Sequence, residues 1–174
     1  MPESVRCSRY EVDSARSFVR IKAHSTLHDI DGRGPISGFI EAAFFGDRLS
    51  TDAGVHAHLE IPVERLDSGN AAQDREMHQI IGSKSFPNIV ADLVDAKPRP
   101  EANRYTVMGR IGVRGTTRLI SGEIAMRQRD GLIELDGERS IDIRAFGIKP
   151  PRILVFQVNP EISILLHVVA KLSG

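Results

Sequence analysis

The stretch Val55-His56-Ala57-His58-Leu59-Glu60-Ile61-Pro62-Val63 alternates apolar and polar side chains without interruption. Because successive side chains of a β-strand point to opposite faces, this alternation predicts a half-buried strand. Segments with a similar pattern occur at 17–24, 36–43, 89–97, 104–113, 118–127, 132–143 and 162–172. We therefore expect an all-β fold of about eight strands, arranged either as a sandwich or as a barrel.

Turn-forming residues separate many of these segments. Glycine supplies a positive φ, and Asp and Asn side chains bond their own backbone, so both favour turns. We expect the chain to turn at Asp31-Gly32, Asp52-Ala53-Gly54, Pro98 to Asn103, Arg114-Gly115-Thr116 and Asp130-Gly131.

One segment has the period of a helix instead. A methionine and two isoleucines share one face of residues 71–81. Asn70 stands before the segment as an N-cap, and Gly82 follows it as a C-terminal stop. We expect one short amphipathic helix over 71–81. The sequence contains no linker or low-complexity tract, so residues 1–174 are expected to form a single domain.

Composition narrows the classes of function. Lys plus Arg and Asp plus Glu both number 23, so the formal net charge is zero. Nucleic-acid-binding domains usually carry a basic face, so we expect no nucleic-acid partner. The longest apolar run, Ile164 to Ala170, contains His167 and is far shorter than the about 20 residues of a membrane-spanning helix. We expect a protein that does not span a membrane.

The N-terminal stretch MPESVRCSRY lacks the apolar segment of a signal peptide. Cys7 is the single cysteine, so an intramolecular disulfide cannot form. We expect a cytoplasmic protein, or a periplasmic or secreted one if a signal has been removed.

The inner face of the predicted strands carries small and medium side chains. Aromatic residues make up only 5% of the chain, and tryptophan is absent. A barrel of about eight strands has an interior that side chains can just fill, or that holds one small ligand. Small inner residues favour a cavity, and a solidly packed core is the alternative. The alternation assigns these residues to the lumen: Val19, Ile21, Ala57, Leu59, Ile61, Ile89, Ala91, Leu93, Val107, Gly109, Ile111, Ile164 and Leu166.

Residues 162–170 are apolar on both faces, so the outer face of this strand should be covered as well. The helix or a partner subunit would serve as the cover. If a partner subunit covers this face, the protein is a homodimer.

Two polar clusters contain residue types that occur in catalytic or metal sites. His56 and His58, with Glu60 beyond them, have a spacing that suits zinc, but the alternation turns them toward solvent. Between His24 and Asp31 several residues of the kinds used in catalytic triads lie close in sequence, yet no nucleophile elbow or oxyanion hole is evident. We predict no catalytic residue, no metal site and no cofactor.

The order of several short motifs resembles the YceI-like, or polyisoprenoid-binding, family over residues 9–171. The motifs are Tyr10-Glu11-Val12-Asp13 with Ser17, Leu66-Asp67-Ser68-Gly69-Asn70, Asp74-Arg75, Phe86-Pro87-Asn88-Ile89, Tyr105-Thr106-Val107-Met108-Gly109, Gly115-Thr116-Thr117 and Phe146-Gly147-Ile148. This resemblance implies a closed antiparallel, lipocalin-like barrel of eight strands. It also implies a lumen that binds a hydrophobic small molecule, such as an isoprenoid, a quinone tail or a fatty-acyl chain.

The chain departs from the family pattern at two positions. The family often has His before the serine of the first strand, where this chain has Arg16, and an acidic residue before the Phe-Gly-Ile motif, where it has Ala145. For this reason we do not infer from the resemblance any polar contact between this chain and the head group of a ligand.

Three hypotheses follow. The leading one is a carrier or sequestering protein for an amphiphilic apolar molecule. The second is an enzyme that acts on such a molecule in the lumen, with His24 or His28 near the mouth. The third is a structural or regulatory barrel filled by its own side chains.

Overall fold

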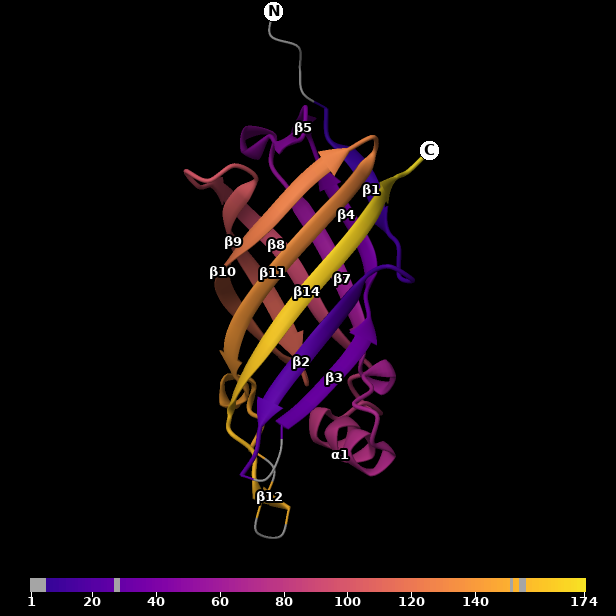
Figure 1. Cartoon of the computed structure of the whole chain (residues 1–174), viewed down its shortest axis with the longest axis vertical. Coiled ribbons are helices and arrows are strands. Elements are labelled where there is room, and N and C mark those ends of the chain that lie inside the picture. Colours follow the sequence, from indigo (N-terminus) through magenta and orange to yellow (C-terminus); the bar gives the residue numbers. More distant parts are fainter. Residues whose placement is uncertain (1–5, 27–28, 151, 154–155) are drawn as a thin grey trace, which may run out of the picture.

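The computed structural model describes residues 6–26, 29–150, 152–153 and 156–174, and its main feature is an antiparallel sheet that closes into a barrel (Figure 1). The order β1-β4-β7-β8-β9-β10-β11-β14 returns to β1, because β14 also pairs with β1. The strands of this sheet are β1 (Ser8–Val12), β2 (Phe18–His24), β3 (Asp29–Pro35), β4 (Ser37–Ala42), β7 (His56–Pro62), β8 (Asn88–Pro98), β9 (Arg104–Val113), β10 (Thr116–Arg129), β11 (Leu132–Asp142) and β14 (Glu161–Leu172). The predicted all-β, eight-stranded closed barrel is confirmed.

Ten strand segments make an eight-stranded barrel because two of the long strands are broken. β1 and β2 both pair with β14, one beyond the other, and together act as one kinked strand. β3 pairs with β2 and β4 pairs with β1, so these two segments also act as one broken strand, with Ile36 between them. At the first kink the Ser17 hydroxyl donates to the Val169 carbonyl at 3.2 Å and accepts from the Val169 N–H at 2.9 Å. This buried side chain replaces ladder hydrogen bonds that the kink removes.

A glycine allows the second broken strand to approach its neighbour. Gly38 in β4 has a φ of +136°, and a Cβ there would lie 1.9 Å from the carbonyl oxygen of His58. Only glycine fits this close approach. The backbone of β4 can therefore pack tightly against β7.

The predicted helix is confirmed as α1 (Ala71–Ile81). The Asn70 side chain accepts from the N–H of Gln73 at 3.1 Å, and Gly82 adopts a left-handed conformation at the C-terminus. None of the helices in the described part of the chain is long and apolar enough to cross a bilayer.

The short elements lie mainly at the two ends of the barrel. We call the end that carries the termini the upper end and the end beside α1 the lower end, as in Figure 1. The upper end carries the hairpin β5 (Phe44–Phe45) and β6 (Arg48–Leu49) with η1 (Thr51–Ala53). The lower end carries η2 (Val63–Arg65), η3 (Ile143–Phe146) and the hairpin β12 (Arg152–Ile153) and β13 (Phe156–Gln157).

Two expectations are wrong. Asp31-Gly32 is not a turn but part of β3, where Gly32 pairs with Ile21. The Asp31 carboxylate binds Arg20 across the strands at 2.6 and 2.9 Å, so it serves as a cross-strand partner rather than a turn residue. The helix does not cover residues 162–170, because α1 lies beside β3 and η2, away from β14 (Figure 1).

Candidate functional site

The upper half of the barrel is a solid core. Inward side chains there, such as Ile40, Met126 and Ile133, have no more than 1% of their surface exposed. The hydroxyl of Tyr105 accepts a hydrogen bond from the backbone N–H of Leu49 at 2.9 Å, which satisfies a polar group inside this core. Side chains therefore fill the upper lumen.

The lower half is hollow. It encloses a cavity of about 330 Å³ with an almost wholly apolar wall. Val107, Ile111 and Ile164 share the inward face by register, yet each keeps part of its surface exposed because it faces this void. An apolar cavity of about 150 Å³ stays dry and binds benzene. A cavity about twice as large can hold roughly a dozen carbon atoms by the same proportion.

The structure places all thirteen residues assigned to the lumen on the wall of this cavity. They come from five strands and are Val19, Ile21, Ala57, Leu59, Ile61, Ile89, Ala91, Leu93, Val107, Gly109, Ile111, Ile164 and Leu166. The alternation therefore located the cavity wall, and contact of these residues with a ligand stays a prediction.

The assignment missed part of the wall. Helix α1 contributes Met77, Ile80 and Ile81, whose shared helical face was visible in the sequence. The alternation of β10 and β11 could have added Ile120 and Ile141, but no lumen residue was assigned on those strands. Phe146 and Ile148 close the lower end from outside the barrel strands, and their position has no signal in the strand pattern.

Hydrogen bonds hold α1 to the loop before it, and this loop is tied to the barrel where the backbone of Asp67 pairs with that of Arg33 in β3. The Asp74 carboxylate accepts from the Ser68 hydroxyl at 2.6 Å and from the Ser68 N–H at 2.9 Å. Partial burial raises the pKa of Asp74, but these hydrogen bonds outweigh burial, so the pKa lies below its usual value. The Ser68 and Asp74 motifs of the sequence thus fix the helix that forms one side of the cavity.

The wall of the cavity is open between β10 and β11. These strands pair from Arg129 and Leu132 down to Ile124 and Gly137, and below that point each pairs only with its other neighbour. The cavity is lined by residues of both separated edges. We call this opening, between residues 118–123 and 138–142, the β10–β11 slit. Arg118 closes its lower end, since its Nε donates to the carbonyl of Ala145 at 2.8 Å.

The histidine pair of β7 lies on the outer face, as expected. The ring of His58 bonds Asp92 at 2.7 Å through Nδ1 and Glu60 at 3.1 Å through Nε2. The hydrogen bonds to these two carboxylates raise the pKa of His58, and Asp92 has the larger effect. His56 is more exposed, and its Nε2 lies 3.6 Å from Asp92. In the described part of the chain no three His, Cys, Asp or Glu side chains are arranged to hold a metal ion.

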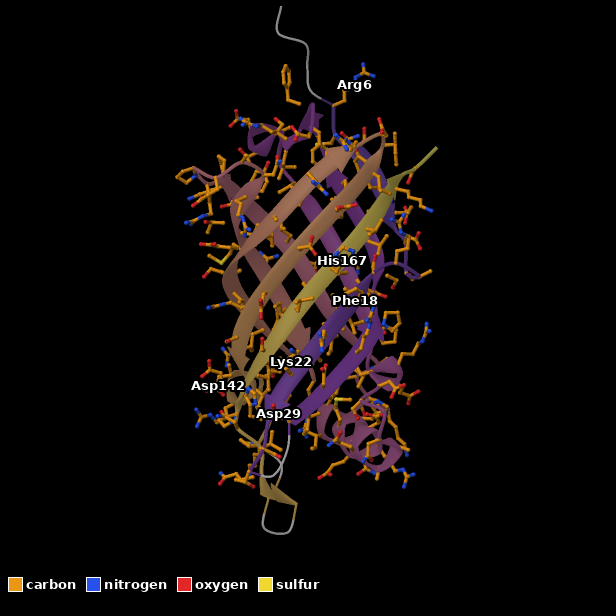
Figure 2. All side chains as sticks on the ribbon, in the orientation of Figure 1. Arg6, Phe18, Lys22, Asp29, Asp142 and His167 are labelled. Atoms are coloured by element: carbon orange, nitrogen blue, oxygen red, sulfur yellow. The ribbon has the colours of Figure 1, made fainter. Side chains whose placement is uncertain are left out.

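The second polar cluster lies at the lower rim. His24 and Asp29 are cross-strand partners, and Nδ1 of His24 lies 2.6 Å from the Asp29 carboxylate. Both side chains are largely exposed, and neither is among the described residues that line the cavity. Figure 2 labels Asp29, Lys22 and Asp142, which all lie toward this end of the barrel. His28 lies outside the described residues.

A closed antiparallel barrel that encloses an apolar cavity in one half is a lipocalin-like barrel. Within that class the chain belongs to the YceI-like family, because the family model for the YceI-like domain matches residues 10–170. No curated protein matches the sequence.

Solved structures share the fold. BcnA of Burkholderia cenocepacia superposes with a TM-score of 0.77 at 20% identity, over 92% of this chain and 99% of that one. A polyisoprenoid-binding domain from Saccharophagus degradans, implicated in plant cell wall breakdown, gives a TM-score of 0.72 at 10% identity, over 94% and 98% of the two chains. The YceI protein of Campylobacter jejuni gives 0.69 at 14% identity, over 87% and 90%.

Proposed function

We propose that this protein binds one amphiphilic molecule and sequesters or carries it, with the apolar chain of the ligand in the hollow lower half of the barrel. The observation that supports this function is the contrast between the two halves. The inward side chains of the upper half are fully buried, whereas the lower half leaves an apolar void of about 330 Å³. The thirteen lumen residues are the proposed contacts of the chain.

The energetics of such a site need no catalytic group. Each buried CH₂ contributes about 0.8 kcal/mol, so a tail of roughly a dozen carbons contributes about 10 kcal/mol. Association costs about 4–15 kcal/mol in lost translational and rotational freedom. Burial of the tail therefore offsets most or all of this cost, and a polar contact to the head of the ligand would add to the affinity.

The ligand class follows from the shape and chemistry of the wall. An almost wholly apolar cavity of about 330 Å³ suits an unbranched or methyl-branched chain, which is the chemistry of an isoprenoid, a quinone tail or a fatty-acyl group. The domain from Saccharophagus degradans is described as polyisoprenoid-binding, which agrees with this class.

We infer binding without catalysis. The enzymatic alternative placed His24 near the mouth, but His24 is held by Asp29 at the outer rim. Among the described residues that line the cavity none is a histidine or a cysteine. The lumen thus offers an apolar surface rather than a nucleophile beside its base.

Extraction of the purified protein with organic solvent, followed by mass spectrometry, distinguishes the three hypotheses. We expect one amphiphile per protein chain and no change in its chemical structure during incubation. Conversion of the ligand would support the enzyme. An extract without lipid, together with failure of the protein to bind added alkyl chains, would contradict a carrier and favour a self-filled barrel.

The homodimer stays a prediction. Light scattering over a range of protein concentrations tests it, and a monomer at every concentration would contradict it.

A further inference from the structure

Charged side chains are almost excluded from the inner face of the barrel. The register of the ten described barrel strands defines which positions point inward. Only two of these positions carry a charged residue. Arg118 of β10 is the partner of the inward Ile111, and Arg139 of β11 is the partner of the inward Ile164. Both charges are positive, and they stand on the two strands that separate.

The two arginines therefore border the β10–β11 slit from opposite sides. Arg139 lines the cavity and is also exposed to solvent, so its side chain connects the apolar lumen with the opening. Gly122, on the opposite edge, also lines the cavity, and a Cβ built there meets no atom within 4 Å. A ligand can occupy this space without displacing a side chain.

The acidic side chains around the slit do not neutralise the two arginines. Among the described residues neither guanidinium forms an ion pair. Glu123 binds Arg99 at 3.0 Å, and Asp142 binds Arg144 at 2.7 Å. Glu123 and Glu138 also contribute to the cavity lining, but by register their side chains point to the outer face, where Ser163 donates to Glu138 at 3.4 Å. The inner side of the slit therefore keeps an unpaired positive charge beside an apolar cavity.

We propose that the β10–β11 slit holds an anionic head group, a carboxylate or a phosphate, of the amphiphile whose tail fills the cavity, and that Arg139 binds it. This proposal rests on the proposed function. Among the described residues Arg139 has no ion-pair partner, and it is exposed at the edge of the apolar cavity, so its guanidinium can reach an anion there. A guanidinium binds a carboxylate or a phosphate through two parallel hydrogen bonds, which gives both strength and orientation. Arg118 adds positive charge at the lower end of the slit while its Nε holds the Ala145 carbonyl.

This site also explains how the ligand can exceed the cavity. The void accommodates roughly a dozen carbons by comparison with a benzene-sized cavity. A longer molecule must leave the barrel, and the slit is a side opening with separated strand edges. The head group then lies at the wall of the barrel.

The test compares probes with one tail and different heads. Dodecanoate, dodecyl phosphate, dodecanol and dodecylamine are titrated into the full chain by calorimetry at a pH where both acids are ionised. We expect at least one of the two anions to bind about tenfold or more tightly than dodecanol, the factor that a charge-assisted hydrogen bond supplies. The tighter of the two anions identifies the head as a carboxylate or a phosphate.

Variants locate the effect. Arg139→Gln should remove the preference for the anion and leave dodecanol binding unchanged. Arg110→Gln is the matched control, because Arg110 is an exposed arginine on the outer face of the neighbouring strand. It removes the same charge and should keep the preference. Arg118→Gln should weaken the preference for the anion in part. This variant replaces Arg139→Gln as the test if Arg139→Gln does not fold.

The outcomes separate the two proposals. Equal affinity for the four probes, or tightest binding of dodecylamine, would overturn the head-group site and leave tail binding intact. An anion preference that survives both Arg139→Gln and Arg118→Gln would overturn the assignment to the slit. If no probe binds, the proposed function is wrong, and the head-group site is wrong with it.

Discussion

Two alanines on neighbouring strands allow a direct test of the difference between the two halves of the lumen. Ala57 lies between Ile40 and Leu93 in the ladder, at the border of the packed half, and only 2% of its surface is exposed. Ala91 pairs with Leu59 and Ile111, lines the cavity and is only partly buried. We would replace each of them by phenylalanine.

The same substitution should destabilise the protein at Ala57 and leave its stability almost unchanged at Ala91. Ala57 also lines the cavity, but at its border with the packed half and with almost no exposed surface, so a ring there meets buried neighbours and the overpacking costs about 1–3 kcal/mol of unfolding free energy. At Ala91 the ring enters the void, so the free energy of unfolding should change by less than about 1 kcal/mol. A ring the size of benzene takes about half of the cavity and displaces about six carbons of a tail. At about 0.8 kcal/mol each, that loss weakens tail binding at least a hundredfold.

Urea denaturation measures the stability, and calorimetry with dodecanol measures the binding. The expected result for Ala91→Phe is a native-like midpoint together with lost binding. If Ala91→Phe destabilises the protein as strongly as Ala57→Phe, the lower half is filled by its own side chains. If Ala91→Phe binds dodecanol with wild-type affinity, the tail lies elsewhere.

Three further predictions follow from single contacts. Ser17→Ala leaves the buried N–H of Val169 without its partner, and should lower the unfolding free energy by about 1–3 kcal/mol in denaturant titration; a loss below about 0.5 kcal/mol would show that the hydroxyl does not support the kink. Gly38→Ala places a Cβ 1.9 Å from a backbone oxygen and should prevent folding or strongly destabilise the protein, whereas Gly122→Ala should fold with wild-type stability by circular dichroism; equal stability of the two variants would refute the close approach. His58 has a raised pKa in the folded state, so its contribution to stability is complete below the unfolded pKa of about 6.5 and is lost as the pH rises through the folded value. The stability difference between wild type and His58→Gln should therefore shrink from pH 5 to pH 9, and a difference independent of pH would contradict the ion pair with Asp92.

Local patterns predicted most of the fold because they reflect local physics. The strict alternation around Ala57 sets both the strand and its inward face, since a strand has a period of two residues. Asn70 and Gly82 mark the two ends of α1 because helix termini need side-chain or left-handed caps. Asp130-Gly131 adopts positive φ at both residues and joins β10 to β11, as its composition predicts.

Features that depend on distant contacts could not be predicted in this way. The Asp31-Gly32 pair has the composition of a turn, and only its partners Arg20 and Ile21 on β2 keep it in a strand. The slit is not visible in the alternation of β10 or β11, because both strands continue without a break while their mutual pairing ends. Arg139 breaks the apolar pattern of its strand, but its meaning depends on the register with Ile164. The packed upper half results from residues that many segments contribute together.

The most direct test of tail burial in the lower lumen is the affinity of the protein for a series of straight-chain alcohols of increasing length. If the chain enters the apolar cavity, each added CH₂ should contribute about 0.8 kcal/mol, which is about a fourfold gain in affinity. The gain should stop near a dozen carbons, where the cavity of about 330 Å³ is full. An affinity that does not change with chain length, or no binding of any alcohol, would contradict a ligand-binding lumen.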